Sequence, residues 1–337
     1  MSVLVTGGAG YIGSHTCVRL IEAGRRVVVA DDLSNSKMEA VRRVEQITGA
    51  DVRFYLADVR EALGLRRIFE NEDIDAVIHF AGNKAVGESV AQPLQYYGNN
   101  IQSAVTVLSV MREMGVSRFV FSSSATVYGD PETVPIPEDA PLHAENPYGR
   151  TKLFIEEMLR DLHAAAPEMS IAILRYFNPV GAHPSGLIGE DPAGIPNNLF
   201  PYVTQVACGK LPKLRIFGGD YPTPDGTGVR DYLHVMDLAD GHIAALKKLE
   251  RQTGLFTYNL GTGRGCSVLE MIEAFRRATG REIPFEITGR RPGDVPSYYA
   301  DPSRAKAELG WQASRSIEEM CRDAWNWQSK NPAGYPD

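Results

Sequence analysis

Val3-Leu4-Val5-Thr6-Gly7-Gly8-Ala9-Gly10-Tyr11-Ile12-Gly13 is an apolar strand that runs into a glycine turn, and a helical pattern follows at once. Gly7 permits the tight turn, Gly10 lets the backbone approach a pyrophosphate, and Gly13 lets the helix pack closely on the strand. The free N–H groups at the start of such a helix attract phosphate charge. A glycine pattern alone is weak evidence, but this strand–turn–helix context predicts a dinucleotide-binding unit.

A carboxylate follows the next apolar run, Val27–Ala30, 18 residues after Gly13. At the end of that strand Asp31 is placed to accept hydrogen bonds from both ribose hydroxyls and to repel a 2′-phosphate, which selects NAD over NADP. Asp31 can also simply cap the following helix, and Asp32 competes for either role. Asp58, after the third predicted strand, faces the adenine edge or is an ordinary loop residue; the sequence leaves both readings open.

Short β-branched runs alternate with helical patterns over the first half of the chain, which predicts an α/β fold with a Rossmann-type doubly wound parallel sheet. We expect strands at Val3–Val5, Val27–Ala30, Val52–Tyr55, Ala76–Phe80, Phe119–Ser122 and Ile171–Arg175, and helices near 12–23, 37–48, 61–71, 90–114 and 147–166. Residues 1–177 form the expected NAD-binding domain, with parts of about 230–260 contributing. Residues 178–337 form a smaller, partly interleaved lobe with helices near 197–209, 235–249, 267–279 and 316–329 and a strand near 256–260.

The composition excludes several classes of protein. The chain has 337 residues, 43 % of them hydrophobic, and a net charge of −7. This acidity argues against non-specific binding to nucleic acid or anionic membranes, and no apolar run reaches the length of a membrane span. Four widely spaced cysteines, without a CxxC pair, fit a reducing cytoplasm better than a disulfide framework. The histidine and cysteine spacing indicates no metal site.

A second motif carries proton-transfer chemistry. Tyr148 and Lys152 stand one helical turn apart and so face the same side of a predicted helix. They follow a strand that ends in Ser122-Ser123-Ser124, and the ends of parallel strands carry the site in this kind of sheet. A nearby ammonium and a positively charged nicotinamide favour the phenolate, so Tyr148 can act as a general base on a substrate hydroxyl, with Ser124 relaying the proton. A packed tyrosine beside a solvated lysine is the alternative.

These motifs resemble the extended short-chain dehydrogenase/reductase family, and more narrowly its nucleotide-sugar 4-epimerases. The resemblance covers essentially the whole chain. It is carried by the glycine loop through His15 and by the stretches His79–Gly82, Lys84–Ser89, Ser122–Gly129, Arg175–Ala182, Gly194–Leu199 and Asp225–Tyr232. The glycine loop and the Tyr-Lys pair are shared by the wider family, whereas Ala182–Ser185 and Ile195–Asn198 are narrower signals.

The resemblance implies an NAD-dependent isomerase that interconverts UDP-galactose and UDP-glucose in galactose metabolism. Tyr148 takes the proton of the 4-hydroxyl, C4 gives its hydride to tightly held NAD, and the resulting 4-ketose turns over before hydride and proton return. This chemistry needs a firm hold on UDP and a loose hold on the hexose. The family also implies a homodimer formed through the helices near 90–114 and 147–166, although their apolar residues could equally be internal core.

The resemblance implies two sets of binding residues. The cofactor set is Gly7, Gly10, Tyr11, Ile12, Gly13, Asp31, Asp32, Leu33, Ser34, Asn35, Ser36, Asp58, Val59, Phe80, Ala81, Gly82, Lys84, Asn99, Ser122, Tyr148, Lys152 and Phe177. The substrate set is Lys84, Ser124, Tyr148, Asn178, Asn198, Leu199, Ile216, Phe217, Arg230, Arg291, Asp294 and Tyr298. In it Ile216 and Phe217 match the uracil pocket, Arg230 and Arg291 match a diphosphate clamp, and Asp294 matches a ribose contact.

Some positions qualify the resemblance. Tyr298 matches the back of the sugar pocket, where a bulky residue is associated with exclusion of N-acetylhexosamines; it can also merely pack. Asp32 replaces a common Asn, and its charge favours NAD over NADP. Asn83 and Gly98 also depart from the usual residues, and Asn83 lies beside the expected nicotinamide site. None of these departures removes a catalytic group.

Three other functions compete. Nucleotide-sugar dehydratases usually place an Asp-Glu pair after the serine or threonine of the site, and decarboxylases commonly place a Glu there, whereas this chain has Ala125-Thr126. A catalytically silent NAD-binding protein would be free to lose Tyr148, Lys152 or Ser124, and all three are present. The sequence therefore favours an epimerase. The alternative to the UDP-galactose/UDP-glucose pair is another NAD-dependent nucleotide-sugar epimerase, or a decarboxylase, of the same family.

Overall fold

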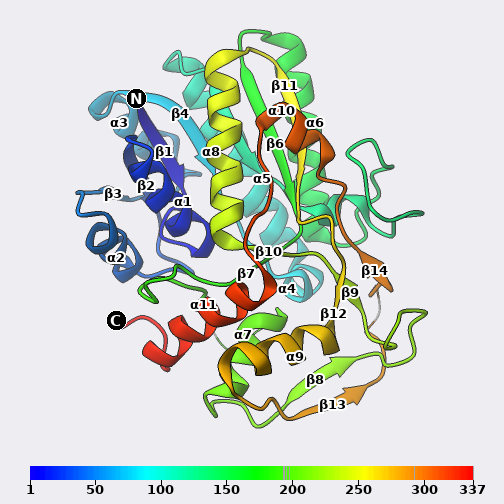
Figure 1. Cartoon of the computed structure of the whole chain (residues 1–337). Helices are drawn as coiled ribbons and strands as arrows, with labels where there is room; N and C mark the ends of the chain where they lie inside the picture. The colour runs from blue at the N-terminus through cyan, green and yellow to red at the C-terminus, as the bar shows by residue number, and fades with distance from the viewer. Residues whose placement is uncertain (193, 195, 197, 292, 337) are drawn as a thin grey trace.

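The computed structural model describes all residues except 193, 195, 197, 292 and 337. Its centre is a parallel seven-stranded sheet in the order β11-β6-β5-β4-β1-β2-β3 (Figure 1). The order reverses at β1, and such a switch point opens a crevice at the carboxyl ends of the strands. These strands are β1 (Ser2–Thr6), β2 (Arg26–Asp31), β3 (Arg53–Leu56), β4 (Ile74–His79), β5 (Arg118–Ser122), β6 (Ser170–Tyr176) and β11 (Leu255–Leu260).

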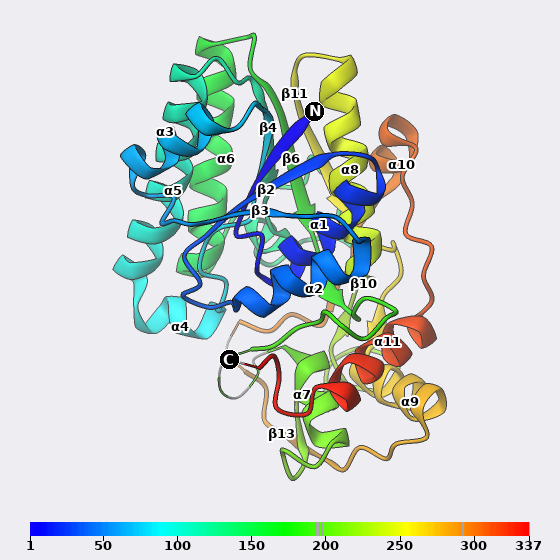
Figure 2. The same ribbon diagram turned by 90° about the vertical axis from the view of Figure 1, so that its left-hand side faces the viewer.

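Helices cover both faces of this sheet, so the central strands are apolar on both sides (Figure 2). One face carries α1 (Tyr11–Glu22), α2 (Met38–Thr48) and α8 (Val235–Arg251), and the other carries α3 (Ala62–Asn71), α5 (Pro93–Glu113) and α6 (Pro147–Ala165). Val3, Leu4 and Val5 of β1 are fully buried. The predicted α/β class and doubly wound parallel sheet are confirmed.

The prediction of a single helix near 90–114 is wrong in one respect, because the structure has two helices in this region. α4 (Val86–Ala91) ends before Gln92, and α5 begins at Pro93. Proline has no N–H to continue the ladder and disfavours helical backbone in the residue before it. Gln92 accordingly has φ −131° and ψ 58°. The first turn of α5 starts afresh with proline, which suits that position.

A second lobe lies below the sheet in Figure 1 and has its own apolar core. Its helices are α7 (Leu199–Ala207), α9 (Val268–Thr279) and α11 (Ile317–Lys330). Among its short strands, β8 (Leu214–Phe217) pairs with β13 (Phe285–Thr288), and β9 (Val229–Arg230) lies between β12 (Cys266–Ser267) and β14 (Ser297–Tyr298) and pairs with both. The remaining elements are η1 (Ala125–Tyr128), β7 (Asn178–Val180), β10 (Tyr232–His234) and α10 (Ser303–Leu309).

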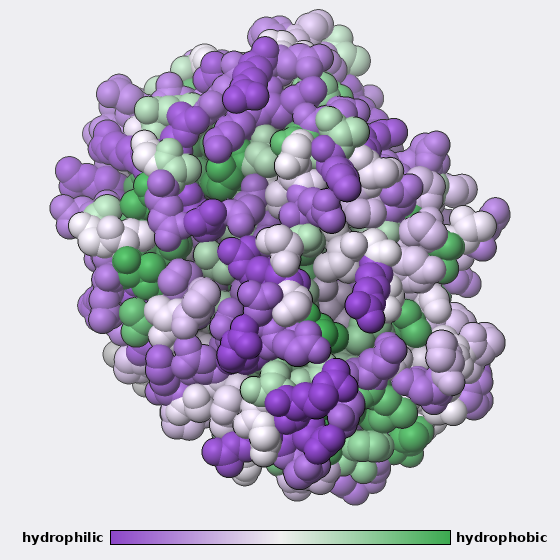
Figure 3. Space-filling view, in the orientation of Figure 1, coloured by the Kyte–Doolittle hydropathy of each residue, from purple (hydrophilic) through white to green (hydrophobic). Residues whose placement is uncertain are grey.

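The chain passes between the two parts of the molecule more than once. It leaves the large sheet after β6, returns through α8 and β11, and then leaves again toward α9. The face drawn in Figure 3 is largely hydrophilic, with only small separate apolar areas. Within the described residues, no helix is both long enough and apolar enough to cross a membrane.

Candidate active site

The glycine loop is shaped by contacts that leave no room for side chains. Gly7 has φ +71°, and a Cβ there would lie 2.8 Å from the backbone nitrogen of Ala81, beyond β4. A Cβ on Gly13 would lie 2.3 Å from the Gly7 carbonyl oxygen. α1 begins at Tyr11 after Gly10, and no side chain caps it. The first-turn N–H groups of α1 therefore suit an anionic ligand, as a dinucleotide pyrophosphate requires.

Asp31 lies at the end of β2, and only 7 % of its surface is exposed. Its carboxylate accepts hydrogen bonds from the Ala9 N–H (3.0 Å), the Leu33 N–H (3.0 Å) and the Ser36 hydroxyl (2.7 Å). Burial raises the pKa of Asp31, and these three donors oppose the rise. A carboxylate has about four acceptor positions, so capacity remains for a ribose hydroxyl beside the glycine loop.

The other residues expected around the adenosine surround Asp31 or follow β3. Asp32 is exposed and accepts from Ser34, and Leu33 adopts φ 57°. Asn35 is exposed as well, whereas Val59 is buried. The Asp58 carboxylate is paired with the Arg60 guanidinium at 2.5 Å, and hydrogen bonds from that group lower its pKa.

The segment after β4 brings several expected cofactor residues together. Phe80 packs on the His242 ring at 4.8 Å, and the Asn83 N–H donates to the Asn100 side chain at 2.7 Å. That same Asn100 oxygen accepts from Asn99 at 3.2 Å. A Cβ on Gly82 would lie 3.0 Å from it, and Gly82 has φ +153°. The backbone of the segment is thus held close to Asn100.

Tyr148 and Lys152 lie in the first turns of α6, which starts at Pro147 with Asn146 as its cap. Both residues are 6 % exposed. Ser124, two residues after the end of β5, interacts with the Tyr148 side chain, and Lys152 donates from Nζ to the Ser122 carbonyl oxygen at 2.8 Å. The structure therefore places Tyr148, Lys152 and Ser124 together at the carboxyl edge of the sheet.

The proton affinities of this pair are set by burial. Burial raises the pKa of Tyr148 well above its ordinary value, an effect that the interaction with Ser124 opposes. Burial lowers the pKa of Lys152 to about 8. A phenol in this position loses its proton only when positive charge lies beside it. A cationic nicotinamide supplies such charge, so the chemistry of these residues suits an oxidised dinucleotide.

The residues expected to bind the nucleotide of the substrate converge from separate strands and loops. The Arg291 guanidinium lies over the Phe217 ring at 4.6 Å. The Asp294 carboxylate lies 3.0 Å from Arg291 and 3.8 Å from Arg230. Two guanidinium groups around one carboxylate, one of them over an aromatic ring, can hold a diphosphate attached to a stacked base.

The hexose end of the expected site is nearer to Tyr148. Tyr298 and Phe177 pack ring to ring, with their centroids 5.5 Å apart. Asn178 and Asn198 are exposed, Leu199 is half-buried at the start of α7, and Ile216 is buried in β8. Residues 195 and 197 of the narrower sequence signal lie outside the described residues.

Tyr176 and Glu190 are among the side chains that contact expected site residues although the sequence analysis assigned them no role. Tyr176, the last residue of β6, interacts with the Tyr148 side chain. The Glu190 carboxylate lies 2.9 Å from Lys84 Nζ and accepts from Asn198 at 3.3 Å. Tyr176 follows Arg175 within a motif that was already singled out, so its position at a strand end could have drawn attention to it. Glu190 offered no such signal.

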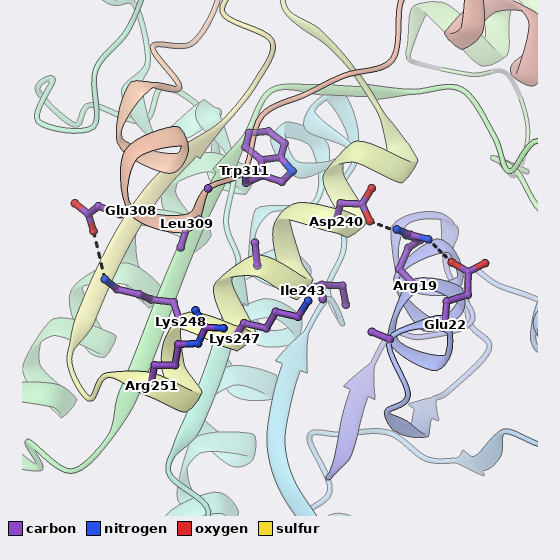
Figure 4. A pocket seen from close by; sticks show the side chains of 13 residues that line it. Arg19, Glu22, Asp240, Ile243, Lys247, Lys248, Arg251, Glu308, Leu309 and Trp311 are labelled. Carbon is purple, nitrogen blue, oxygen red and sulfur yellow. Dashed lines mark hydrogen bonds and ion pairs between the residues drawn. The ribbon is translucent and has the colours of Figure 1, made fainter.

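A cavity of about 470 Å³ lies elsewhere, between α1, α8 and α10 (Figure 4). The carboxyl-terminal turns of α1 and α8 line it, which places it at the amino edge of the sheet, away from Tyr148. Charged side chains around it pair with one another: Arg19 with Asp240 at 2.6 Å and Lys248 with Glu308 at 4.0 Å. This cavity takes no part in the site described above.

Comparisons with known proteins agree with this geometry. Residues 4–324 match the family model of GDP-mannose 4,6 dehydratase. The chain is 61 % identical over 335 residues to the UDP-glucose 4-epimerase of Bacillus subtilis (strain 168), covering 99 % of each chain. It resembles the crystal structure of UDP-glucose 4-epimerase from Bifidobacterium longum in complex with NAD+ and UDP, with a TM-score of 0.96, 54 % identity and coverage of 99 % and 100 % of the two chains.

A second solved structure is equally similar. It is UDP-glucose-4-epimerase from Stenotrophomonas maltophila with bound NAD and formylated UDP-arabinopyranose, with a TM-score of 0.97 and 52 % identity over 98 % of this chain and 99 % of that one. The similarity therefore extends over both the large sheet and the second lobe.

Proposed function

This chain belongs to the UDP-glucose 4-epimerases of the extended short-chain dehydrogenase/reductase family, and from that membership we propose that it interconverts UDP-glucose and UDP-galactose with bound NAD. The observation that carries the proposal is the position of Tyr148, which lies beside Ser124 at the same edge of the sheet as the glycine loop. A general base there reaches a substrate hydroxyl that faces a bound dinucleotide.

The matching family model is named for a dehydratase, but the residues beside Tyr148 do not suit elimination of water. Elimination needs an acid and a base after Ser124, and η1 supplies Ala125 and Thr126 there. The Thr126 hydroxyl donates to Ser124 at 3.0 Å. The same positions lack the Glu that decarboxylases commonly carry. An epimerase needs neither group.

The cofactor is NAD. When bound, it would accept a hydride from C4 of the sugar and return it to the opposite face of the 4-ketose. The glycine loop and the first turn of α1 receive the pyrophosphate, and Asp31 receives the adenosine ribose. Lys84, Asn99 and Phe177 border the nicotinamide end. The remaining cofactor residues named above line the path between these ends.

Tyr148 and its neighbours move the proton. Tyr148 removes the proton of the 4-hydroxyl, Ser124 steadies that hydroxyl, and the Lys152 ammonium favours the phenolate. Lys152 is held for this task by the Ser122 carbonyl, at 2.8 Å. The same proton returns through Tyr148 once the 4-ketose has turned over.

The second lobe holds the nucleotide while the hexose turns. Arg230 and Arg291 bind the diphosphate, Phe217 and Ile216 border the uracil, and Asp294 binds the ribose. Asn178, Asn198 and Leu199 complete the grip on the UDP-sugar. We place the boundary between the NAD-binding domain and this lobe after residue 177, with α8 and β11 belonging to the former.

A conversion assay tests the proposal. Purified protein incubated with UDP-galactose, without added NAD, should form UDP-glucose until the two sugars reach equilibrium. Absence of conversion even after NAD is added would reject this substrate pair.

We also propose a homodimer that forms through α5 and α6. Large apolar side chains on these helices and on α4 are exposed, among them Leu94 at 83 %, Val90 at 63 % and Phe154 at 46 %. The Phe154 ring stacks with Tyr97 at 6.1 Å, which gives the surface a defined shape. Exposed apolar area of this kind marks an association surface. In the proposed dimer, α5 and α6 of one protomer pack against the same two helices of the second copy and form a four-helix bundle.

Sedimentation velocity tests the dimer. Phe154→Glu should shift the protein to monomer, whereas Leu63→Glu, at a leucine of α3 that is 72 % exposed, should leave the dimer intact. A wild-type monomer would contradict the proposal. We place the enzyme in the cytoplasm, in keeping with its four free cysteines.

A further inference from the structure

A buried ion pair lies directly behind the proton-transfer residues. Glu156 is on α6, one turn after Lys152 and two turns after Tyr148, and its side chain is 0 % exposed. The Arg175 guanidinium on β6, 2 % exposed, donates from Nη2 to one carboxylate oxygen at 2.6 Å and from Nε to the other at 3.0 Å. This is a two-pronged arginine–carboxylate pair enclosed in the protein.

Further hydrogen bonds tie the pair to the elements that carry the site. Glu156 accepts from the Ser123 hydroxyl at 2.7 Å and from Arg160 at 2.9 Å. Arg175 also donates to the Tyr128 hydroxyl at 3.0 Å and to the Glu138 carbonyl at 2.9 Å. The network therefore joins α6 to the ends of β5 and β6 and to η1.

Stability alone is a weak reason for such a pair. Desolvation of two charges offsets much of their attraction, and well-packed apolar residues commonly replace buried pairs at no cost. The position of this pair points instead to a role in the proton-transfer site. Ser123 stands between Ser122, whose carbonyl holds Lys152, and Ser124, which meets Tyr148. Arg175 is followed by Tyr176, which also meets Tyr148.

We propose that Glu156, held by Arg175 and Ser123, is a positioning residue that aligns α6 with the ends of β5 and β6 and keeps Lys152 in its ammonium form for proton transfer at Tyr148. The alignment follows from the hydrogen bonds above. The kinetic part of this inference rests on the proposed epimerase function, whereas the effect on the Lys152 charge does not.

The charge effect follows from what surrounds Lys152. Its ammonium donates to the Ser122 carbonyl and lies 4.9 Å from the Phe121 ring on β5 and 5.9 Å from the Tyr148 ring on α6. The titratable groups whose charges interact with it from the neighbouring elements are Glu156, one turn further along α6, and His79 on β4. Burial keeps His79 neutral, with a pKa of about 3. Glu156 is thus the anion that raises the pKa of Lys152 against the effect of burial, which brings it down to about 8.

Glu156→Gln in the full-length holoenzyme tests the proposal, because it keeps the shape of the side chain and removes its charge. We expect the Lys152 ammonium to titrate roughly one pH unit lower, seen in the ¹³C NMR signal of its ε-carbon and assigned by loss of that signal in Lys152→Met. We also expect the alkaline limb of kcat to move down by the same amount, with KM for UDP-galactose and the retained NAD nearly unchanged.

Two further variants separate charge from structure. In Glu156→Gln/Arg175→Gln the uncompensated guanidinium is removed as well, so the alkaline limb should move back toward wild type, which a purely structural defect would not do. Glu157→Gln is the matched control, since Glu157 is the exposed neighbour that also pairs with Arg160. It should leave both the titration and kcat unchanged.

Ser123→Ala probes the same contact should Glu156→Gln not fold, and a several-fold lower kcat with unchanged KM is expected. A wild-type titration and a wild-type pH profile in the Glu156→Gln protein would overturn the inference, as would wild-type kcat in the Ser123→Ala protein. If wild-type protein does not convert UDP-galactose but the NMR titration shifts as expected, the proposed function fails and the charge effect stands.

Discussion

The Tyr298 hydroxyl donates a hydrogen bond of 2.5 Å to the backbone carbonyl of Ala125, the residue that follows Ser124. This bond ties the short strand β14 of the second lobe to η1 beside the proton-transfer site. The Tyr298 ring also packs against Phe177. The Tyr298 side chain is therefore held at both its ring and its hydroxyl, and in the proposed function it closes the hexose end of the site.

Tyr298→Ser should widen the hexose end of the site. The removed ring leaves space for an N-acetyl group, so turnover of UDP-N-acetylglucosamine should rise at least about tenfold relative to UDP-glucose. The measurement is kcat/KM for both sugars, with Tyr299→Ser as the control at the neighbouring position. Comparable turnover of UDP-N-acetylglucosamine by the wild-type protein would show that Tyr298 does not select the sugar.

Tyr148→Phe should remove the general base and leave the binding site in place. Loss of a positioned base costs about 10²–10⁴-fold in rate, so kcat should fall by that amount while NAD content and UDP affinity stay near wild type. Turnover assays and UDP titration calorimetry measure the two effects. Wild-type kcat in this variant would assign the base to another residue.

Much of this site could be predicted from the sequence because its parts are local. The glycine loop, Asp31 at a strand end and the Tyr148–Lys152 spacing each lie within one strand–turn–helix unit, where residue type and spacing determine the geometry. Asp31 follows the glycine loop by one helix and one strand, α1 and β2. Because β1 and β2 pair side by side, the Ala9 N–H donates to the Asp31 carboxylate at 3.0 Å.

Long-range contacts account for what the sequence did not reveal. The sequence analysis gave Glu156 no role and did not pair it with Arg175, and the packing of α6 against β6 brings the two side chains together. The strands of the second lobe have two to four residues and pair with partners far along the chain, as β8 does with β13. Such short segments carry too little periodicity to be recognised.

Asp31→Asn should weaken the preference for NAD. The amide keeps the shape of the side chain but loses the charge that repels a 2′-phosphate, so affinity for NAD should fall about tenfold and the ratio of NAD to NADP affinity should fall further. Cofactor titration of stripped protein measures both. Asp32→Asn changes an exposed carboxylate and should have the smaller effect; the opposite order would transfer the role to Asp32.

Stability should fall steeply in acid because of buried neutral histidines. Burial lowers the pKa of His15 and His79 to about 3 and that of His242 to about 4. The unfolded chain, with histidine pKa values near ~6.5, binds more protons below that value, so stability is full above pH ~6.5 and declines as the pH falls. Each such histidine contributes about 1.4 kcal/mol per pH unit below ~6.

Urea unfolding between about pH 7 and 5 measures this decline. His242→Leu removes one of the three groups and should make the free energy of unfolding less dependent on pH in that range. The control is His143→Gln, at an exposed histidine, which should leave the slope unchanged. Equal slopes in all three proteins would show that these histidines are not the source.

The most direct test of the account follows the hydrogen on C4. UDP-galactose carrying deuterium at C4 is incubated with the purified protein in ordinary water, and the UDP-glucose formed is examined by mass spectrometry and NMR. If C4 is oxidised and reduced within one enclosed site, the product keeps its deuterium at C4. Loss of the deuterium to water during conversion would contradict oxidation at C4 with return of the same hydrogen.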